Sequence, residues 1–566
     1  MRAFLYALVG ALALDVGACT NPLAVDNTNN PDRNSAFRTA TDLETFLGST
    51  YAIAHSGTLG DAKVLSGGAN DGLQPQLITM GMESVSGLAN FAMGPRSAIP
   101  RNQIDNSING QGSIGNLRDF FVEHSAARLA SLALARLKVL GSLGTVTRDR
   151  RARAFGKFVE GVGLGNLALA YDSAAVLTED NANDATVPLA RYDSVMRAAL
   201  FDLDSAATIA GMVGTAPDGF PLPATWINQA TASITQAQFI QLVHSYKARF
   251  LAGVARSPAD RANNVNWAQV IAEANLGITS DFNILMSPTN GWDVSWPVQH
   301  YATGSASWHQ MSQFFMGMAD TSGGYDTWLL LAPASRAPFL VVTPDKRFPQ
   351  GTNRGAQNND SQPASFASTR YFRNRPPSSD AAGDPLQISM YDFRRSFGFF
   401  SSSRNGPYPV MTAAEIHLLN AEGLLRQGGA ANIDSAAKLI NISRVAKGGL
   451  PPVDITATDT SAVVPGGNAC VPRVPDAAQG YRRTKCGNMW DALKWEYRME
   501  TAFTGYGMWF FAARGWGDLP EGTAVSWPAP YQELQVRQVP IYGLGGVGLP
   551  GGSGRGNYGL FAGGVY

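Results

Sequence analysis

Apolar residues recur at helical spacing through the first half of the chain and again near its end. The segment 151–177 shows this most clearly, because Phe155, Phe158 and Val162 fall on one helical face. A capping box, Thr41 followed by Glu44, predicts the start of another helix. The same apolar spacing predicts further helices at 117–140, 193–209, 235–254, 267–278, 413–426, 434–444 and 489–503. Helices of this length in pairs favour a mainly α fold, a tetratricopeptide-like helical repeat scaffold.

Four glycines interrupt the predicted helix at 151–177: Gly156, Gly161, Gly163 and Gly165. Glycine weakens an exposed helix, but its missing side chain allows a second helix to approach closely. We therefore expect other helices to pack tightly against this one.

The chain between 285 and 409 lacks helical periodicity and is rich in Gly, Ser, Asn, Pro and aromatic residues. One 37-residue stretch of this segment contains four of the chain's 11 tryptophans, with two tyrosines among them. Flat rings on a loop-rich surface can stack on sugar rings, so these side chains are candidate ligand-binding residues. They are Trp292, Trp296, Tyr301, Trp308, Tyr325 and Trp328. The alternative is that they fill a satellite core under long loops.

A second loop-rich stretch, 67–111, lies between the first two predicted helices. It is rich in Asn and Gln, and Asn70 and Asp71 are its candidate ligand-binding residues.

Charge and composition narrow the class of protein. The 566 residues carry 44 basic and 44 acidic side chains, and a neutral chain without a basic run argues against nucleic acid as a partner. A hydrophobic content of 45% is ample for a core. The six histidines are scattered, and no nucleophile elbow, phosphate loop or Cys-x-x-Cys pattern occurs. The sequence therefore predicts no catalytic residue, no metal site and no cofactor.

The first residues predict export and a lipid anchor. Arg2 precedes an apolar run at 3–14, too short to span a bilayer, and Val16-Gly17-Ala18-Cys19 forms a lipobox. We expect a signal peptide at 1–18, a lipidated Cys19 at the mature N-terminus, and a polar tether at 19–36. The alternative is an ordinary secretory peptide with a chance cysteine.

Cysteine usage agrees with export. The chain has three cysteines, and lipidation of Cys19 leaves the pair Cys470 and Cys486. An oxidising compartment permits a disulfide between them. Two reduced loop thiols are the alternative.

Several C-terminal motifs occur in a recognisable order. They are Ala414-Glu415, Leu418 and Ala421-Glu422; Ile440-Asn441, Arg444 and Gly449-Leu450-Pro451; Glu496, Arg498, Glu500, Phe503, Gly505, Trp509 and Arg514; and Trp527-Pro528 with Glu533-Leu534. Together with the lipobox, these motifs resemble the SusD/RagB family of surface nutrient-binding lipoproteins. Thr412, Gly507 and Phe511 depart from the residues usual in that family. The physical interpretation of the motif residues Glu415, Glu496, Glu500 and Arg514 is that they are structural ion partners near packed helix ends.

The resemblance implies a SusD-like division of the chain. An N-terminal helical region would occupy 37–284, and a loop-rich ligand region with a C-terminal helical region would occupy 285–566. It also implies a non-enzymatic outer-membrane lipoprotein at the cell surface. This protein would capture a nutrient, by default an oligosaccharide, and pass it to a SusC-like TonB-dependent transporter. The alternatives are a surface helical-repeat scaffold that binds proteins and a secreted glycoside hydrolase.

Overall fold

In a computed structural model of the chain, the described residues are 37, 39–60, 72–86, 96–110, 112–181, 187–213, 218–229, 233–292, 309–360, 365–366, 368–375 and 388–566. Side chains are not described at 86, 113, 114, 309 and 310. The predicted signal peptide, Cys19 and the tether lie outside these residues.

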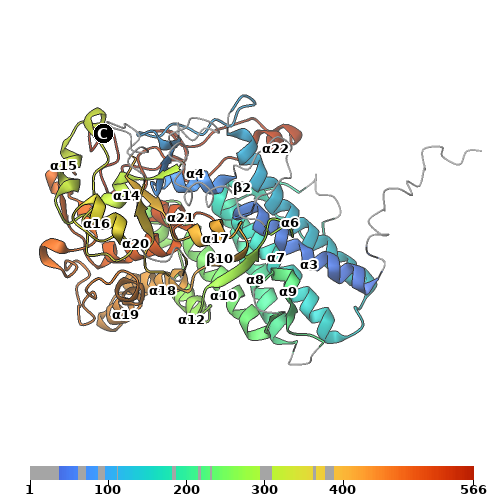
Figure 1. Ribbon diagram of the computed structural model, residues 1–566. Coiled ribbons are helices and arrows are strands. Elements are labelled where there is room, and N and C mark those ends of the chain that lie inside the picture. The colour runs from blue at the N-terminus through green and yellow to red at the C-terminus, as the bar shows by residue number, and fades with distance from the viewer. Residues whose placement is uncertain are drawn as a thin grey trace, which may run out of the picture.

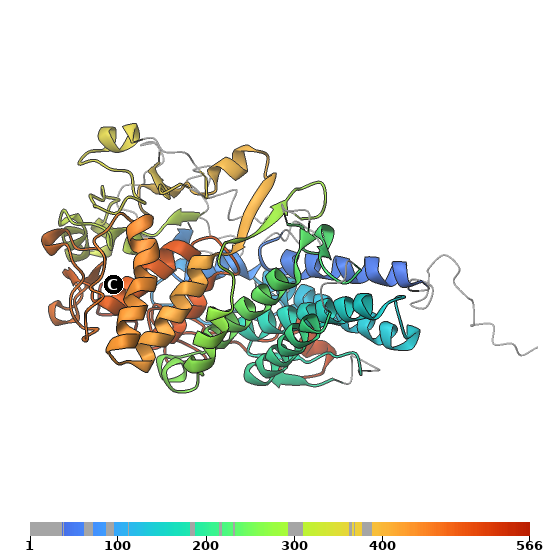
Figure 2. The same ribbon diagram turned by 90° about the horizontal axis from the view of Figure 1, so that it is seen from below.

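The long helices form one continuous array, as Figures 1 and 2 show. In chain order they are α3 (Ala40–Thr58), α6 (Ser113–Leu140), α7 (Val146–Ala170), α8 (Tyr192–Gly211), α10 (Gln236–Gly253), α12 (Trp267–Asn275), α18 (Ala413–Gln427), α19 (Ala430–Ala446) and α20 (Met489–Thr501). Each helix in this series packs against the next. The mainly α fold built from helical hairpins, expected from the sequence, is confirmed.

Helix α7 is enclosed on several sides, because α6, α8 and α10 all pack on it. A Cβ at Gly165 would lie 2.1 Å from the Phe250 ring on α10. A Cβ at Gly163 would lie 2.8 Å from the backbone carbonyl oxygen of Glu123 on α6. The expected role of these glycines in close helix packing is confirmed.

A methyl group at Gly163 is therefore expected to destabilise the protein. Because the nearest atom belongs to the backbone of α6, a side-chain rotation cannot relieve the clash, and Gly163→Ala should cost about 1–3 kcal/mol. Gly211, the last residue of α8, has open space around its Cβ position, so Gly211→Ala should be neutral or stabilise by up to about 1 kcal/mol. Urea unfolding of both variants measures the difference. Equal effects of the two substitutions would contradict this account.

Two predicted helix boundaries are wrong. The N-cap of α3 is Thr39, whose side chain accepts from the Asp42 N–H at 3.1 Å, whereas Glu44 binds Arg151 of α7 at 2.9 Å. Helix α7 ends at Ala170 rather than 177, because the chain turns there into an extended strand. At α3 a neighbouring local capping box, Thr39 with Asp42, sets the start of the helix, and Glu44 is used in a contact with α7 instead.

The strands form six antiparallel pairs among the described residues. The pairs are β1 (Ser84–Ser86) with β7 (His309–Met311), β2 (Ser173–Ala175) with β3 (Leu189–Arg191), β4 (Leu222–Pro223) with β5 (Ser233–Ile234), β6 (Phe282–Met286) with β10 (Gly406–Met411), β8 (Phe372–Asn374) with β9 (Tyr391–Phe393), and β11 (Arg473–Pro475) with β12 (Thr484–Cys486). In the β6–β10 pair, Met286 lies opposite Gly406. The loop-rich segment thus leaves and rejoins the helical array at one place.

Short helices occur in several other described segments. The α-helices are α4 (Leu73–Met80), α9 (Ala224–Ile227), α11 (Pro258–Asn263), α14 (Gln313–Gly317), α15 (Gly324–Leu330), α16 (Arg354–Asn359), α17 (Phe397–Ser401), α21 (Met508–Trp516) and α22 (Tyr531–Val536). The 3-10 helices are η3 (Pro333–Ser335), η5 (Gly467–Ala469) and η6 (Ala477–Gln479). No helix among the described residues is both long enough and apolar enough to cross a membrane.

The described residues form two hydrophobic cores. The larger one runs through the helical array and contains residues from both sides of position 284. The second lies in the loop-rich part, at the left of Figure 1, and packs against Trp495 and Met499 of α20. Helix α20 therefore joins the loop-rich part to the array.

Candidate ligand pocket and the charge network beneath it

A cavity of about 640 Å³ lies where β6, α17, β10, α18, α19 and α20 meet. We call it the Glu500 pocket. Its polar lining includes Asp281, Asn283, Arg395, Asn405, Lys447 and Glu500, and its apolar lining includes Phe366, Phe399, Pro407, Ile442 and Ala446. Its volume is within the usual range for small-molecule sites, about 300–1,000 Å³.

A smaller cavity of about 190 Å³ shares Asp281 and Asn283 with the Glu500 pocket. Three glutamines, Gln229, Gln238 and Gln241, contribute to its lining. The two cavities therefore adjoin and are both rich in hydrogen-bonding groups.

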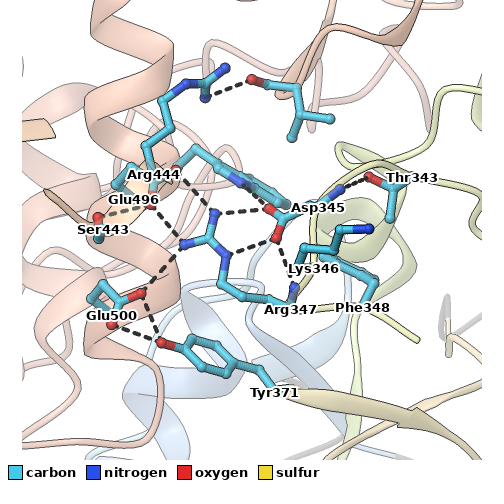
Figure 3. A network of polar contacts seen from close by, with 12 residues as sticks. Thr343, Asp345, Lys346, Arg347, Phe348, Tyr371, Ser443, Arg444, Glu496 and Glu500 are labelled. Carbon is cyan, nitrogen blue, oxygen red and sulfur yellow. Dashed lines mark hydrogen bonds and ion pairs between the residues drawn. The ribbon is translucent and has the colours of Figure 1, made fainter. Parts of the chain in front are cut away.

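The floor of the Glu500 pocket belongs to a buried charge network centred on Arg347, shown in Figure 3. Its guanidinium donates to Glu496 Oε2 at 2.7 Å, Asp345 Oδ2 at 2.8 Å and Glu500 Oε1 at 3.4 Å. Glu496 and Glu500 are four residues apart on α20, so both carboxylates leave one face of that helix. Arg347 thus connects the loop-rich segment to α20.

Burial and charge act against each other in this network. Burial lowers the pKa of Arg347, but Asp345 and Glu496 outweigh burial and shift that pKa well upward overall. Burial raises the pKa of Glu496, and Arg347 offsets only part of that rise. Arg347 is therefore permanently charged and favours the ionised form of Glu496.

Tyr371 and Arg395 connect the network to the pocket. The Tyr371 hydroxyl donates to Glu500 at 2.9 Å, and burial raises its pKa well above the usual value, so it remains a neutral donor. Arg395 lies over the Tyr371 ring, 4.2 Å from its centroid, and its Nη2 is 3.5 Å from Glu500 Oε2. Glu500 is thus fixed in position before any ligand arrives.

The structural role predicted for the motif carboxylates is confirmed. Glu415 accepts two hydrogen bonds of 2.7 Å from Arg249, and Glu496 and Glu500 pair with Arg347. Glu500 is in addition part of the pocket lining, which the sequence interpretation did not anticipate.

Arg514 was predicted to be an ion partner, and this is wrong. It donates to the backbone carbonyls of Gly253, Ala255 and Val525 at 2.9, 3.1 and 2.5 Å. Gly253 is the last residue of α10, where carbonyl groups have no partner within the helix. Arg514 therefore donates to free carbonyl groups at the end of α10, and it does not pair with a carboxylate.

The predicted aromatic platform is not assembled by its described members. Trp292 packs near Tyr51 and His55 in the larger core, whereas Tyr325 and Trp328 are buried in the second core. These three rings belong to the core, which is the alternative that the sequence left open. The other candidates, Trp296, Tyr301, Trp308, Asn70 and Asp71, lie outside the described residues.

Cys470 and Cys486 are joined by a disulfide, with their Cα atoms 5.7 Å apart. The bridge connects the segment before β11 to the end of β12. Among the described residues, no group of three or more His, Cys, Asp or Glu side chains could hold a metal ion.

Sequence reasoning missed most of the pocket. Its lining comes from five separate parts of the chain, so no spacing in the sequence could indicate it. One local signal was present: Arg394-Arg395 stands directly before a run containing Phe397, Phe399 and Phe400. Two cations beside three rings in a loop-rich segment are typical of a binding surface.

An array of helical hairpins with a loop-rich segment built onto its last helices defines a helical-repeat protein that carries a lateral pocket. Two solved structures share this architecture. A SusD superfamily protein from Bacteroides vulgatus aligns with a TM-score of 0.50 and 13% identity, covering 88% of this chain and 91% of that one. A SusD superfamily protein from Bacteroides fragilis aligns with a TM-score of 0.51 and 13% identity, covering 89% and 99%. The chain therefore has the SusD fold. By sequence, no family model and no curated protein matches it.

Proposed function

We propose that this chain is a member of the SusD family that captures a glycan at the cell surface without catalysing a reaction. The observation that carries the proposal is the Glu500 pocket, a cavity of ligand size with aromatic, carboxylate, guanidinium and amide groups on one SusD-type scaffold. Aromatic faces suit the C–H faces of sugar rings, and the polar groups suit hydroxyls. The C-terminal motifs and the lipobox give independent support.

In this proposal the chain works beside a TonB-dependent transporter in the outer membrane. The transporter would receive the ligand, so capture needs only moderate affinity because tight binding would slow transfer. Affinity purification from detergent-solubilised outer membranes of the native host tests the partnership, and a large β-barrel protein is expected to co-purify. Recovery of other proteins without a barrel would favour the alternative of a protein-binding scaffold.

Activity measurements test the non-enzymatic part of the proposal. Incubation of the pure protein with a polysaccharide panel is expected to release no reducing ends. Sustained release that is lost when one carboxylate is changed would favour the glycoside hydrolase alternative.

The lipid anchor has its own test. Because Cys19 would carry the diacylglyceryl group, Cys19→Ala is expected to move the protein from the membrane fraction to the soluble fraction. Palmitate labelling and cell fractionation measure this, with Cys486→Ala as the matched cysteine control. A Cys19→Ala variant that still labels with palmitate would contradict lipidation at this residue.

A further inference from the structure

Arg395 has hydrogen-bond donors that the protein does not use. Its side chain is 3% exposed and lines the Glu500 pocket. Nη2 contacts Glu500, but Nε and Nη1 are buried and have no hydrogen-bond partner among the described residues. A buried donor without an acceptor is costly, so its persistence calls for an acceptor that arrives from outside the chain.

The stacking around Arg395 holds these donors in place. The guanidinium lies 4.2 Å from the centroid of the Tyr371 ring and 5.9 Å from that of Phe366. Phe366 also lines the pocket and is itself held by an edge contact with Tyr408, at 4.9 Å between ring centroids. A guanidinium fixed between rings loses little side-chain entropy when it binds a ligand.

The charges that line the pocket decide between ligand classes. Two cations, Arg395 and Lys447, face two carboxylates, Asp281 and Glu500, so the lining has no net charge. A charged ligand of either sign would meet two groups that attract it and two that repel it, so it gains no net attraction to offset the loss of its hydration. Neutral hydroxyl and ring oxygens accept from Arg395 without that desolvation cost. Such groups can also donate to carboxylates and amides.

We propose that the Glu500 pocket binds an uncharged sugar residue, with Arg395 donating from Nε and Nη1 to its oxygens and Phe366 and Phe399 contacting its C–H faces. This inference rests on the proposed function and goes beyond it, because it assigns the site, the donor and the charge class of the glycan. The adjoining cavity, with its three glutamines, extends the site towards a second sugar residue.

The experiment compares neutral and acidic oligosaccharides by calorimetric titration. The neutral probes are maltohexaose, cellohexaose, xylohexaose and mannohexaose, and the acidic probes are hexagalacturonate and hexaguluronate. We expect binding of at least one neutral probe and of neither acidic one. Arg395→Met should weaken that binding by roughly 10- to 100-fold, because hydrogen bonds from a charged donor are lost.

Matched variants separate binding from folding. Arg394→Met removes the same charge at the adjacent residue, which is not part of the pocket lining, and should leave the affinity unchanged. Arg395→Met should melt within a few degrees of the unmodified protein, because Nε and Nη1 have no protein acceptor to lose, the Nη2 contact with Glu500 is long at 3.5 Å, and Arg347 remains beside Glu500. If Arg395→Met fails to fold, Ala446→Trp tests the site instead. Ala446 is exposed and lines the pocket, so a large ring at this position should block the pocket and weaken binding of the neutral probe.

The outcomes distinguish this inference from the proposed function. Neutral binding that is unchanged in both Arg395→Met and Ala446→Trp would overturn the inference and leave glycan capture intact. Binding of acidic probes alone would overturn the assigned charge class. A protein that binds none of the six probes would contradict both.

Discussion

Replacing Arg347 by methionine is expected to lower the free energy of unfolding by about 3–5 kcal/mol, because the change leaves buried carboxylates without their cation. Arg347 and the side chains of Asp345 and Glu496 are fully buried, so water cannot replace the lost contacts. Methionine retains most of the side-chain volume, so the effect reports charge and hydrogen bonding more than packing. Urea unfolding measures it.

The loss should also depend on pH. Without Arg347, the pKa of Glu496, which burial already raises, should rise further in the folded state. A carboxyl group with a higher pKa in the folded than in the unfolded state binds protons preferentially when folded, so stability falls as pH rises above the ordinary glutamate range. Arg347→Met should therefore be less destabilising at pH 5 than at pH 8.

Arg197→Met is the control for that experiment. Arg197 is 69% exposed on α8, and its salt bridge to Asp193 measures 3.6 Å. Removing an exposed pair of this kind should change the unfolding free energy by less than about 1 kcal/mol. If Arg347→Met behaved like this control, the network would not stabilise the fold.

Trp328→Ala is expected to cost about 3–5 kcal/mol of stability, the usual range for removing a large ring from a core. Trp328 is 3% exposed, makes an edge contact with Phe314 at 5.0 Å, and lies under the Arg336 guanidinium at 4.5 Å. A cavity there would also remove the nearest of the three rings around Arg336. Thermal and urea unfolding measure the loss.

Phe201→Ala provides the comparison, since Phe201 is 68% exposed on α8 and should change stability by less than about 0.5 kcal/mol. The ligand platform inferred from sequence would have required the opposite result for Trp328. That result is unchanged melting together with weaker glycan binding, and observing it would place the Trp328 ring at a ligand surface.

Helical periodicity predicted the scaffold well because each long helix buries a stripe of its own residues. The apolar stripe containing Phe155 and Phe158 is buried in α7, and the predicted span 235–254 matches α10 and its two caps. Boundaries were less predictable. Thr41 and Glu44 form a sound capping pattern, yet Thr39 caps the helix and Glu44 pairs with α7.

The site was harder to predict for a physical reason. A cluster of tryptophans in a sequence indicates a large apolar surface, but it does not show whether that surface faces a ligand or other side chains. Phe314 and Arg336, which enclose Trp328, are not marked by any motif. Conversely, Arg395 and Glu500 are 105 residues apart in the sequence. They come together in the fold because Tyr371 contacts both side chains and Arg347 pairs with Glu500.

The meeting of Met286 and Gly406 across the β6–β10 ribbon has an evolutionary consequence. A segment whose ends are adjacent can be lengthened, shortened or exchanged between related genes without moving the helices that carry it. Recombination at this ribbon would transfer Phe366, Arg395 and Phe399 together and leave Glu500 behind on α20. The part of the pocket on α20 would stay the same in related proteins, while the exchanged segment would supply different lining residues. Each new segment would still have to cover Trp495 and Met499.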